Sequence, residues 1–170
     1  MNVVVQLEPA VDELPRVAYR WDSDTEILIA SFDGTATHDG MSGSVELMGS
    51  DGSWLALDVS HGRVRAVEVA VWPEVETRAT LAPPDTIDER RIVIPARASQ
   101  PGIASVGVDS ALTAETNADE TIIHFRLGKK RDVRTVRLAD HVLVELDTLK
   151  RIAGVWFLNV PKFPETGDPA

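Results

Sequence analysis

The feature of this sequence that most limits its fold is an internal repetition, because the second half repeats the order of segments found in the first. At an offset of 89 residues, the segment 3–5 aligns with 92–94 and the segment 55–58 with 144–147. The segment 63–73 then aligns with 151–161 at an offset of 88 residues. A shared order of segments is typical of a duplicated structural unit. We therefore expect two matching halves, residues 1–81 and 91–163, related by a pseudo-twofold axis.

Each half has the sequence pattern of about six short antiparallel strands. Apolar and polar residues alternate, and Val and Ile, whose branched side chains favour strands, make up much of the apolar set. Turn residues such as Asp33-Gly34 and His61-Gly62 separate the runs. The predicted strands are 3–7, 16–21, 26–32, 44–48, 54–59 and 64–72, then 92–97, 105–109, 121–127, 133–138, 141–147 and 152–160. The predicted fold is mainly β, with two sheets or barrel-like halves and little helix.

The alternation also predicts which side chains share a face, since successive residues of a strand point to opposite sides. Three sets are expected to face the core: Leu28, Ala30 and Phe32; Ile123, Phe125 and Leu127; and Val67, Val69 and Val71 with Val155 and Phe157. His124 is expected on the face opposite Phe125.

Three segments are expected to lie outside the repeated strands. Residues 74–81 could form one or two helical turns after Pro73, and residues 82–90, which contain Pro83-Pro84, are the predicted linker. Residues 112–118 are interpreted as an insertion in the second half. The polar tail, 164–170, is expected to be disordered.

Composition narrows the possible functions. The chain has 27 acidic and 17 basic residues, a net charge of −10, so binding to nucleic acids or anionic membranes is not expected. It has no cysteine, which excludes disulfides and thiol chemistry. The amino terminus lacks a basic region followed by a long apolar run, and no apolar run is long enough to span a bilayer, so a cytoplasmic location is expected.

The first half ends in Leu57-Asp58, a glycine turn and the strand 63–69, and the second half ends in Leu146-Asp147 and the strand 151–157. These segments resemble a family of small bacterial β-rich domains of unknown function. The family pattern ends in Ile-x-Gly-Ile-Glu-Ile, and the second half departs from it by having Trp156 at the Glu position. The resemblance implies β structure and no particular activity.

Three residues are candidates for acid–base chemistry: Asp58 and Asp147, which align between the halves, and His124. A symmetric pair of carboxylates could act as acid and base, although an Asp at a strand end usually accepts hydrogen bonds from turn amides. No histidine pair has metal-ligand spacing, and the acidic turn around Asp22 and Asp24 lacks the glycine of a calcium loop. We predict neither a metal site nor a cofactor.

The candidates for binding are the basic residues Lys129, Lys130 and Arg131 and the aromatic residues Trp72 and Trp156. A basic run in a hairpin usually solubilises a turn and protects an edge strand, but it can also contact an anion or an acidic partner. The two tryptophans occupy nearby positions of the last strand in each half, where they serve as core residues or as contacts to a partner.

These observations favour a non-catalytic binding or interaction module, which could form a homodimer through a strand edge or bind another protein. Two alternatives stay open. One is a small hydrolase that uses Asp58, Asp147 and a nearby histidine. The other is an acidic immunity or antitoxin-like protein that covers a basic partner.

Overall fold

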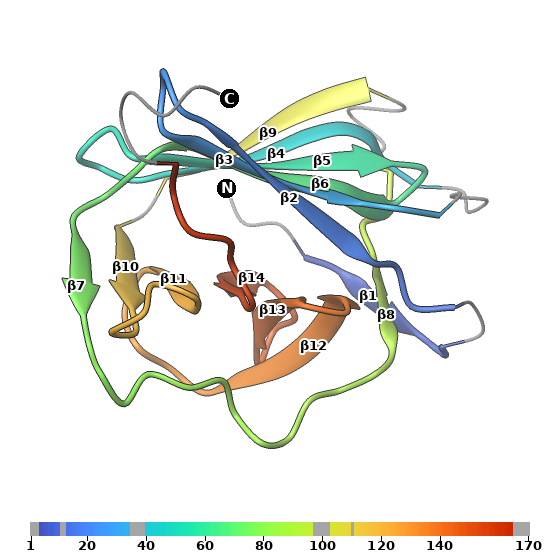
Figure 1. Ribbon diagram of the computed structural model, residues 1–170. Coiled ribbons are helices and arrows are strands. Elements are labelled where there is room, and N and C mark those ends of the chain that lie inside the picture. The colour runs from blue at the N-terminus through green and yellow to red at the C-terminus, as the bar shows by residue number, and fades with distance from the viewer. Residues whose placement is uncertain (1–3, 11–12, 35–39, 97–102, 110, 165–170) are drawn as a thin grey trace.

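The computed structural model describes residues 4–10, 13–34, 40–96, 103–109 and 111–164, and within these ranges it contains strands and no helix (Figure 1). The all-β prediction is confirmed. Residues 165–170, most of the predicted tail, lie outside the described residues.

Two large open sheets face each other, and a short two-stranded ribbon lies beside them (Figure 1). The first sheet has the order β2-β3-β6-β5-β4-β9, with β2 Val17–Asp22, β3 Ile27–Phe32, β4 Ser42–Met48, β5 Trp54–Ser60, β6 Arg63–Val71 and β9 Ile103–Asp109. The second has the order β12-β13-β14-β11-β10-β7, with β7 Val75–Thr77, β10 Leu112–Thr116, β11 Ile123–Leu127, β12 Val133–Ala139, β13 Val142–Asp147 and β14 Ile152–Phe157. The sheets are open, which corrects the barrel-like form that the sequence suggested.

The two sheets share the same order of five antiparallel strands. The order β2-β3-β6-β5-β4 of the first sheet corresponds to β10-β11-β14-β13-β12 of the second. Each sheet then gains one parallel strand from the other half of the chain: β9 pairs with β4, and β7 pairs with β10. This common order agrees with the expected repeat, while the duplication itself stays a prediction.

The first strands of the two halves, β1 (Gln6–Glu8) and β8 (Arg91–Val93), pair with each other to form the ribbon. The residues next to them make reciprocal main-chain hydrogen bonds. The Val5 amide donates to the Lys150 carbonyl (2.9 Å), and the Ile94 amide donates to the Gly62 carbonyl (2.8 Å). Each half therefore attaches its first strand to the last hairpin of the other half.

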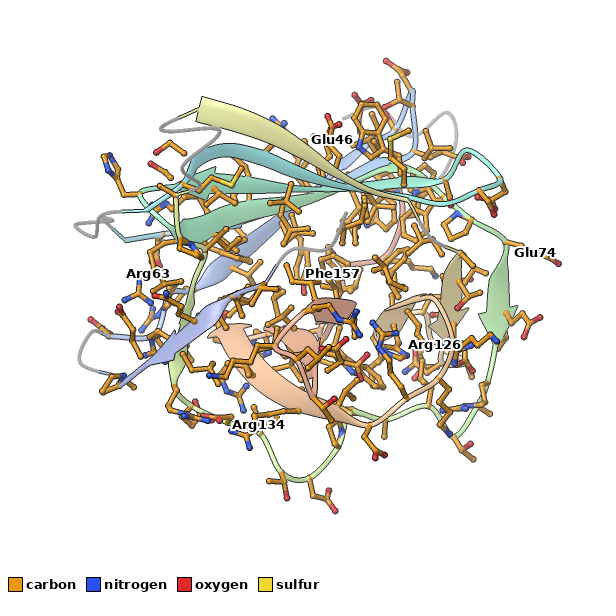
Figure 2. All side chains as sticks on the ribbon, turned by 180° about the vertical axis from the view of Figure 1, so that it is seen from behind. Glu46, Arg63, Glu74, Arg126, Arg134 and Phe157 are labelled. Carbon is orange, nitrogen blue, oxygen red and sulfur yellow. The ribbon has the colours of Figure 1, made fainter. Side chains whose placement is uncertain are left out.

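One hydrophobic core lies between the two sheets and takes side chains from both. Figure 2 shows Phe157 in this interior, whereas Glu46 lies on the outer side of the first sheet. The expected core faces of β3 and β11 are buried as predicted. Val71 is the exception, because it is 46% exposed and lies beyond a β-bulge between Trp54 and Leu55. The halves 1–81 and 91–163 thus share a core.

Two local predictions were wrong. Residues 74–81 form strand β7 and a turn, because the extended Val75–Thr77 segment pairs in parallel with β10. Residues 112–116, expected in an insertion, form β10 and pair with β11. Strand β9 joins the edge of the first sheet, where it pairs in parallel with β4. The partners of β7 and β9 therefore lie in the opposite half of the chain.

Candidate functional site

A pocket of about 320 Å³ lies on the second sheet, on the face turned away from the core. Its wall comes from strands β10 to β14, from the β11–β12 loop and from the start of the segment 78–90. We call it the basic pocket. Five of the eight residues singled out from the sequence line it: His124, Lys129, Lys130, Arg131 and Trp156.

The centre of the pocket is a histidine–carboxylate pair. Nε2 of His124 on β11 lies 2.7 Å from Oε1 of Glu145 on β13, and the two side chains are 12% and 10% exposed. With Glu145 ionised, the carboxylate can only accept, and Nε2 of His124 is then the donor of this hydrogen bond. Each partner offsets the cost of burying the other, and the hydrogen bond between them fixes the orientation of the imidazole ring.

A glycine makes room for this pair. Gly154 lies on β14, which pairs with β11 on one side and with β13 on the other. In these pairings Gly154 is opposite Arg126 of β11 and opposite Glu145 of β13. A Cβ atom at this position would collide with Oε1 of Glu145 and lie 2.6 Å from the Phe125 carbonyl oxygen. Glu145 can therefore reach His124 only because residue 154 has no side chain.

Trp156 forms the flat wall of the pocket. Its ring stacks on the imidazole of His124, with centroids 4.1 Å apart and an interplanar angle of 20°. The indole Nε1 is buried and, among the described residues, has no hydrogen-bond acceptor. Such an orphaned donor is costly in a folded protein.

The segment 78–90 covers this outer face. Figure 1 shows it running along the side of the second sheet that faces away from the first sheet. Leu81 is buried against Leu143 and Trp156, and Ile87 packs on the same cluster. Further along, the Asp88 amide donates to the Thr135 carbonyl (2.8 Å) and the Arg137 amide donates to the Asp88 carbonyl (3.0 Å). As a result β13 and β14 are buried on both faces.

The rim of the pocket is strongly positive. Its lining contains five basic side chains, Arg78, Arg126, Lys129, Lys130 and Arg131, and two acidic ones, Glu115 and Glu145. Both carboxylates have cationic or donor partners: Nε of Arg78 lies 3.3 Å from Oε2 of Glu115, and Glu145 contacts His124.

The basic side chains differ in how they are held. Arg131 donates to the Leu127 carbonyl (2.7 Å) and lies 3.3 Å from the carboxylate of Asp147. Lys129 and Lys130 are exposed, and among the described residues neither ammonium group has an ion-pair or hydrogen-bond partner. The two lysines are therefore the cations most available to a ligand.

Asp147 has a structural role outside the pocket. Its carboxylate accepts hydrogen bonds from the Leu149 and Arg151 amides (2.9 and 3.0 Å) and from Nε of Arg151 (2.7 Å). Burial opposes ionisation of this group, but the hydrogen bonds from Arg151 and Leu149 together hold the pKa of Asp147 below its usual range. Asp147 thus stabilises the β13–β14 hairpin in its charged form.

Asp58 lies in the other sheet, exposed on β5, so the structure does not bring the two aspartates together. Their alignment in the sequence was wrong by two residues. In the β5–β6 pairing, Asp58 is opposite Ala66 and a β-bulge follows directly after Asp58. In the β13–β14 pairing, Glu145 is opposite Gly154 and a β-bulge follows directly after Glu145. Asp58 therefore corresponds to Glu145. A two-residue shift preserves the alternation of faces and is therefore invisible in the sequence pattern.

The remaining candidate, Trp72, lines a different pocket from Trp156. The residue of the first sheet that corresponds to Trp156 in the pairing is Glu68, and Ile29 corresponds to His124. The loop between β3 and β4, residues 33–41, contains no Lys or Arg, unlike the β11–β12 loop. The chemistry of the basic pocket is therefore specific to the second sheet.

Two residues of the site were missed in the sequence. Glu145 reads as one more polar position in an alternating strand, and Gly154 reads as a turn or family-pattern residue. The sequence does contain one sign of the site, which is a glycine inside a predicted strand. Such a glycine allows side chains of the two neighbouring strands, here a His and a Glu, to meet above it.

No family model matches the sequence, and no curated protein matches it. The resemblance to small bacterial β-rich domains therefore stays a prediction. In the part of the chain that the structure describes, no helix has the length and apolar character needed to cross a membrane.

Proposed function

We propose that this protein is a non-catalytic binding module whose basic pocket holds a small anionic ligand. The observation that supports this most strongly is the gathering of five basic side chains around one pocket in a chain of net charge −10. A pocket of about 320 Å³ is of the size that small molecules occupy.

The electrostatics of the lining favour an anion. The carboxylates of Glu115 and Glu145 are already engaged by Arg78 and His124, whereas Lys129 and Lys130 are not engaged. An anionic group near the two lysines would gain charge-assisted hydrogen bonds without displacing an existing pair. The stacked rings of His124 and Trp156 are largely buried and form a rigid part of the pocket lining.

The alternative functions have less support. The hydrolase hypothesis required Asp58 and Asp147 to share a pocket, and the two residues lie in different sheets. The immunity or antitoxin-like hypothesis rests on the net charge of −10 alone.

Citrate, a small trianion, is a suitable probe of the basic pocket. Isothermal titration should detect saturable binding that weakens as salt is added, since exposed charge pairs are screened. Replacing both lysines, Lys129→Gln with Lys130→Gln, should weaken citrate binding by about threefold to 30-fold, if each exposed pair contributes about 0.3–1 kcal/mol.

The chain provides a matched control, because its other two lysines lie outside the basic pocket. The double variant Lys150→Gln with Lys162→Gln changes the net charge equally and should bind citrate as the wild type does. Equal weakening in both double variants would show that overall charge, and not the pocket, attracts the anion. Absence of saturable citrate binding would also refute the proposal.

A further inference from the structure

A second pocket, of about 440 Å³, lies where parts of both sheets meet the carboxyl-terminal segment. Its walls come from the end of β2, the β2–β3 turn, the residue after β6, strand β7, the end of β10 and the β10–β11 turn. The residues that matter here are Trp21, Glu26, Trp72, Glu120 and Phe163. We call it the aromatic pocket.

The aromatic side chains of this pocket are held in fixed positions. Trp21 stacks on Trp72, with centroids 5.7 Å apart and an interplanar angle of 17°, and Phe163 meets Trp21 edge-on at 5.1 Å. The indole of Trp21 donates to the Pro161 carbonyl (2.8 Å), and the indole of Trp72 donates to the Glu26 carbonyl (2.7 Å). Trp72 also contacts Phe125 of the core, with centroids 5.6 Å apart. Because both N–H groups are already used, the ring surface that these contacts leave open to a ligand is apolar and π-electron in character.

The charge of the aromatic pocket is opposite to that of the basic pocket. Its lining includes the acidic residues Glu26 and Glu120 and no Lys or Arg. Within the described ranges neither side-chain carboxylate has an ion-pair or hydrogen-bond partner. Both residues have left-handed backbone conformations, with φ of 60° and 58°, in the corresponding β2–β3 and β10–β11 turns. Each turn thus contributes one acidic residue to the pocket lining.

From this combination we propose that the aromatic pocket binds a small organic cation, such as a quaternary or alkylated ammonium compound. Aromatic faces attract cations through their quadrupole, and alkylated ammonium groups are favoured because they lose little hydration. The two carboxylates add charge complementarity, and the cavity volume suits a small molecule. This site is separate from the basic pocket and does not depend on the function proposed for it.

Choline and its neutral isostere 3,3-dimethyl-1-butanol test the charge preference directly, because they have the same shape. Titration calorimetry should show saturable binding of choline and at least about tenfold weaker binding of the neutral alcohol, the ratio expected for a partly desolvated cation–π contact with added carboxylates. In ¹H–¹⁵N spectra choline should move the indole signals of Trp21 and Trp72 and leave that of Trp156 in place.

Variants separate the pocket from the general negative charge. Glu26→Gln with Glu120→Gln should weaken choline binding by at least about threefold. Glu74→Gln with Asp119→Asn removes the same charge nearby without changing a lining residue, and Figure 2 shows Glu74 at the edge of the molecule; this variant should bind as the wild type does. Equal binding of alcohol and choline, absence of choline binding, or equal weakening in both variants would overturn the proposal.

Discussion

The packing of the segment 78–90 on the second sheet can be tested with Leu81→Ala. Leu81 is only 3% exposed and contacts Leu143 and Trp156 in a small cluster separate from the main core. The substitution removes three carbon atoms, which at about 0.8 kcal/mol per buried methylene amounts to about 2.4 kcal/mol. The cavity adds little, because a surface segment can relax onto the sheet, so we expect a loss of about 2–3 kcal/mol in the free energy of unfolding.

Urea unfolding followed by tryptophan fluorescence measures this loss, and Leu149→Ala is the matched control. Leu149 is 62% exposed in the β13–β14 hairpin, so the same chemical change there should cost less than about 0.5 kcal/mol. In hydrogen exchange, Leu81→Ala should also speed exchange of the Asp88 and Arg137 amides, whose hydrogen bonds join the segment to β12. Equal stability of the two variants, with unchanged exchange, would refute the packing described here.

Two further predictions concern the hairpin and the pocket. Asp147→Asn should lower the free energy of unfolding by about 1–3 kcal/mol near neutral pH. Because the pKa of Asp147 is lowered in the folded state, the stabilisation by its carboxylate is fully present above the unfolded pKa of about 3.9. This stabilisation disappears as the pH falls through the folded pKa. Thermal unfolding at about pH 7 and about pH 3 measures it, and a gap that does not narrow in acid would contradict this account. Gly154→Ala should cost about 1–3 kcal/mol through overpacking, and less in a Glu145→Ala background, where the collision with the carboxylate is gone. A double-mutant cycle with no coupling would show that Gly154 does not make room for Glu145.

The alternation of side chains predicted most strands and their faces correctly. Phe125 faces the core and His124 faces outward because the period of two is a property of each strand alone. The basic run at Lys129, Lys130 and Arg131 was also visible as a local feature, and it does line a pocket together with His124. The local sequence pattern was therefore sufficient to predict features that depend on a single strand or loop.

Sequence reasoning was wrong where pairing joins distant segments. Strands β7 and β9 each leave their own half and add in parallel to the opposite sheet, and nothing in a run such as Val75–Thr77 specifies that partner. The alignment of Asp58 with Asp147 was wrong because a shift of two residues leaves every face unchanged. The role of the segment 78–90 as a cover was hidden because its prolines indicate only an irregular connection.

The sequence by itself determined that this chain is an all-β protein with repeated segment order, outward-facing His124 and a local basic run, because these are properties of neighbouring residues. Only the tertiary structure decided that His124 meets Glu145 across Gly154, that Trp156 stacks on the histidine, and that Leu81 packs on Trp156. Those contacts join residues far apart in the chain, and their geometry follows from strand register and sheet order, which the packing of the whole molecule sets.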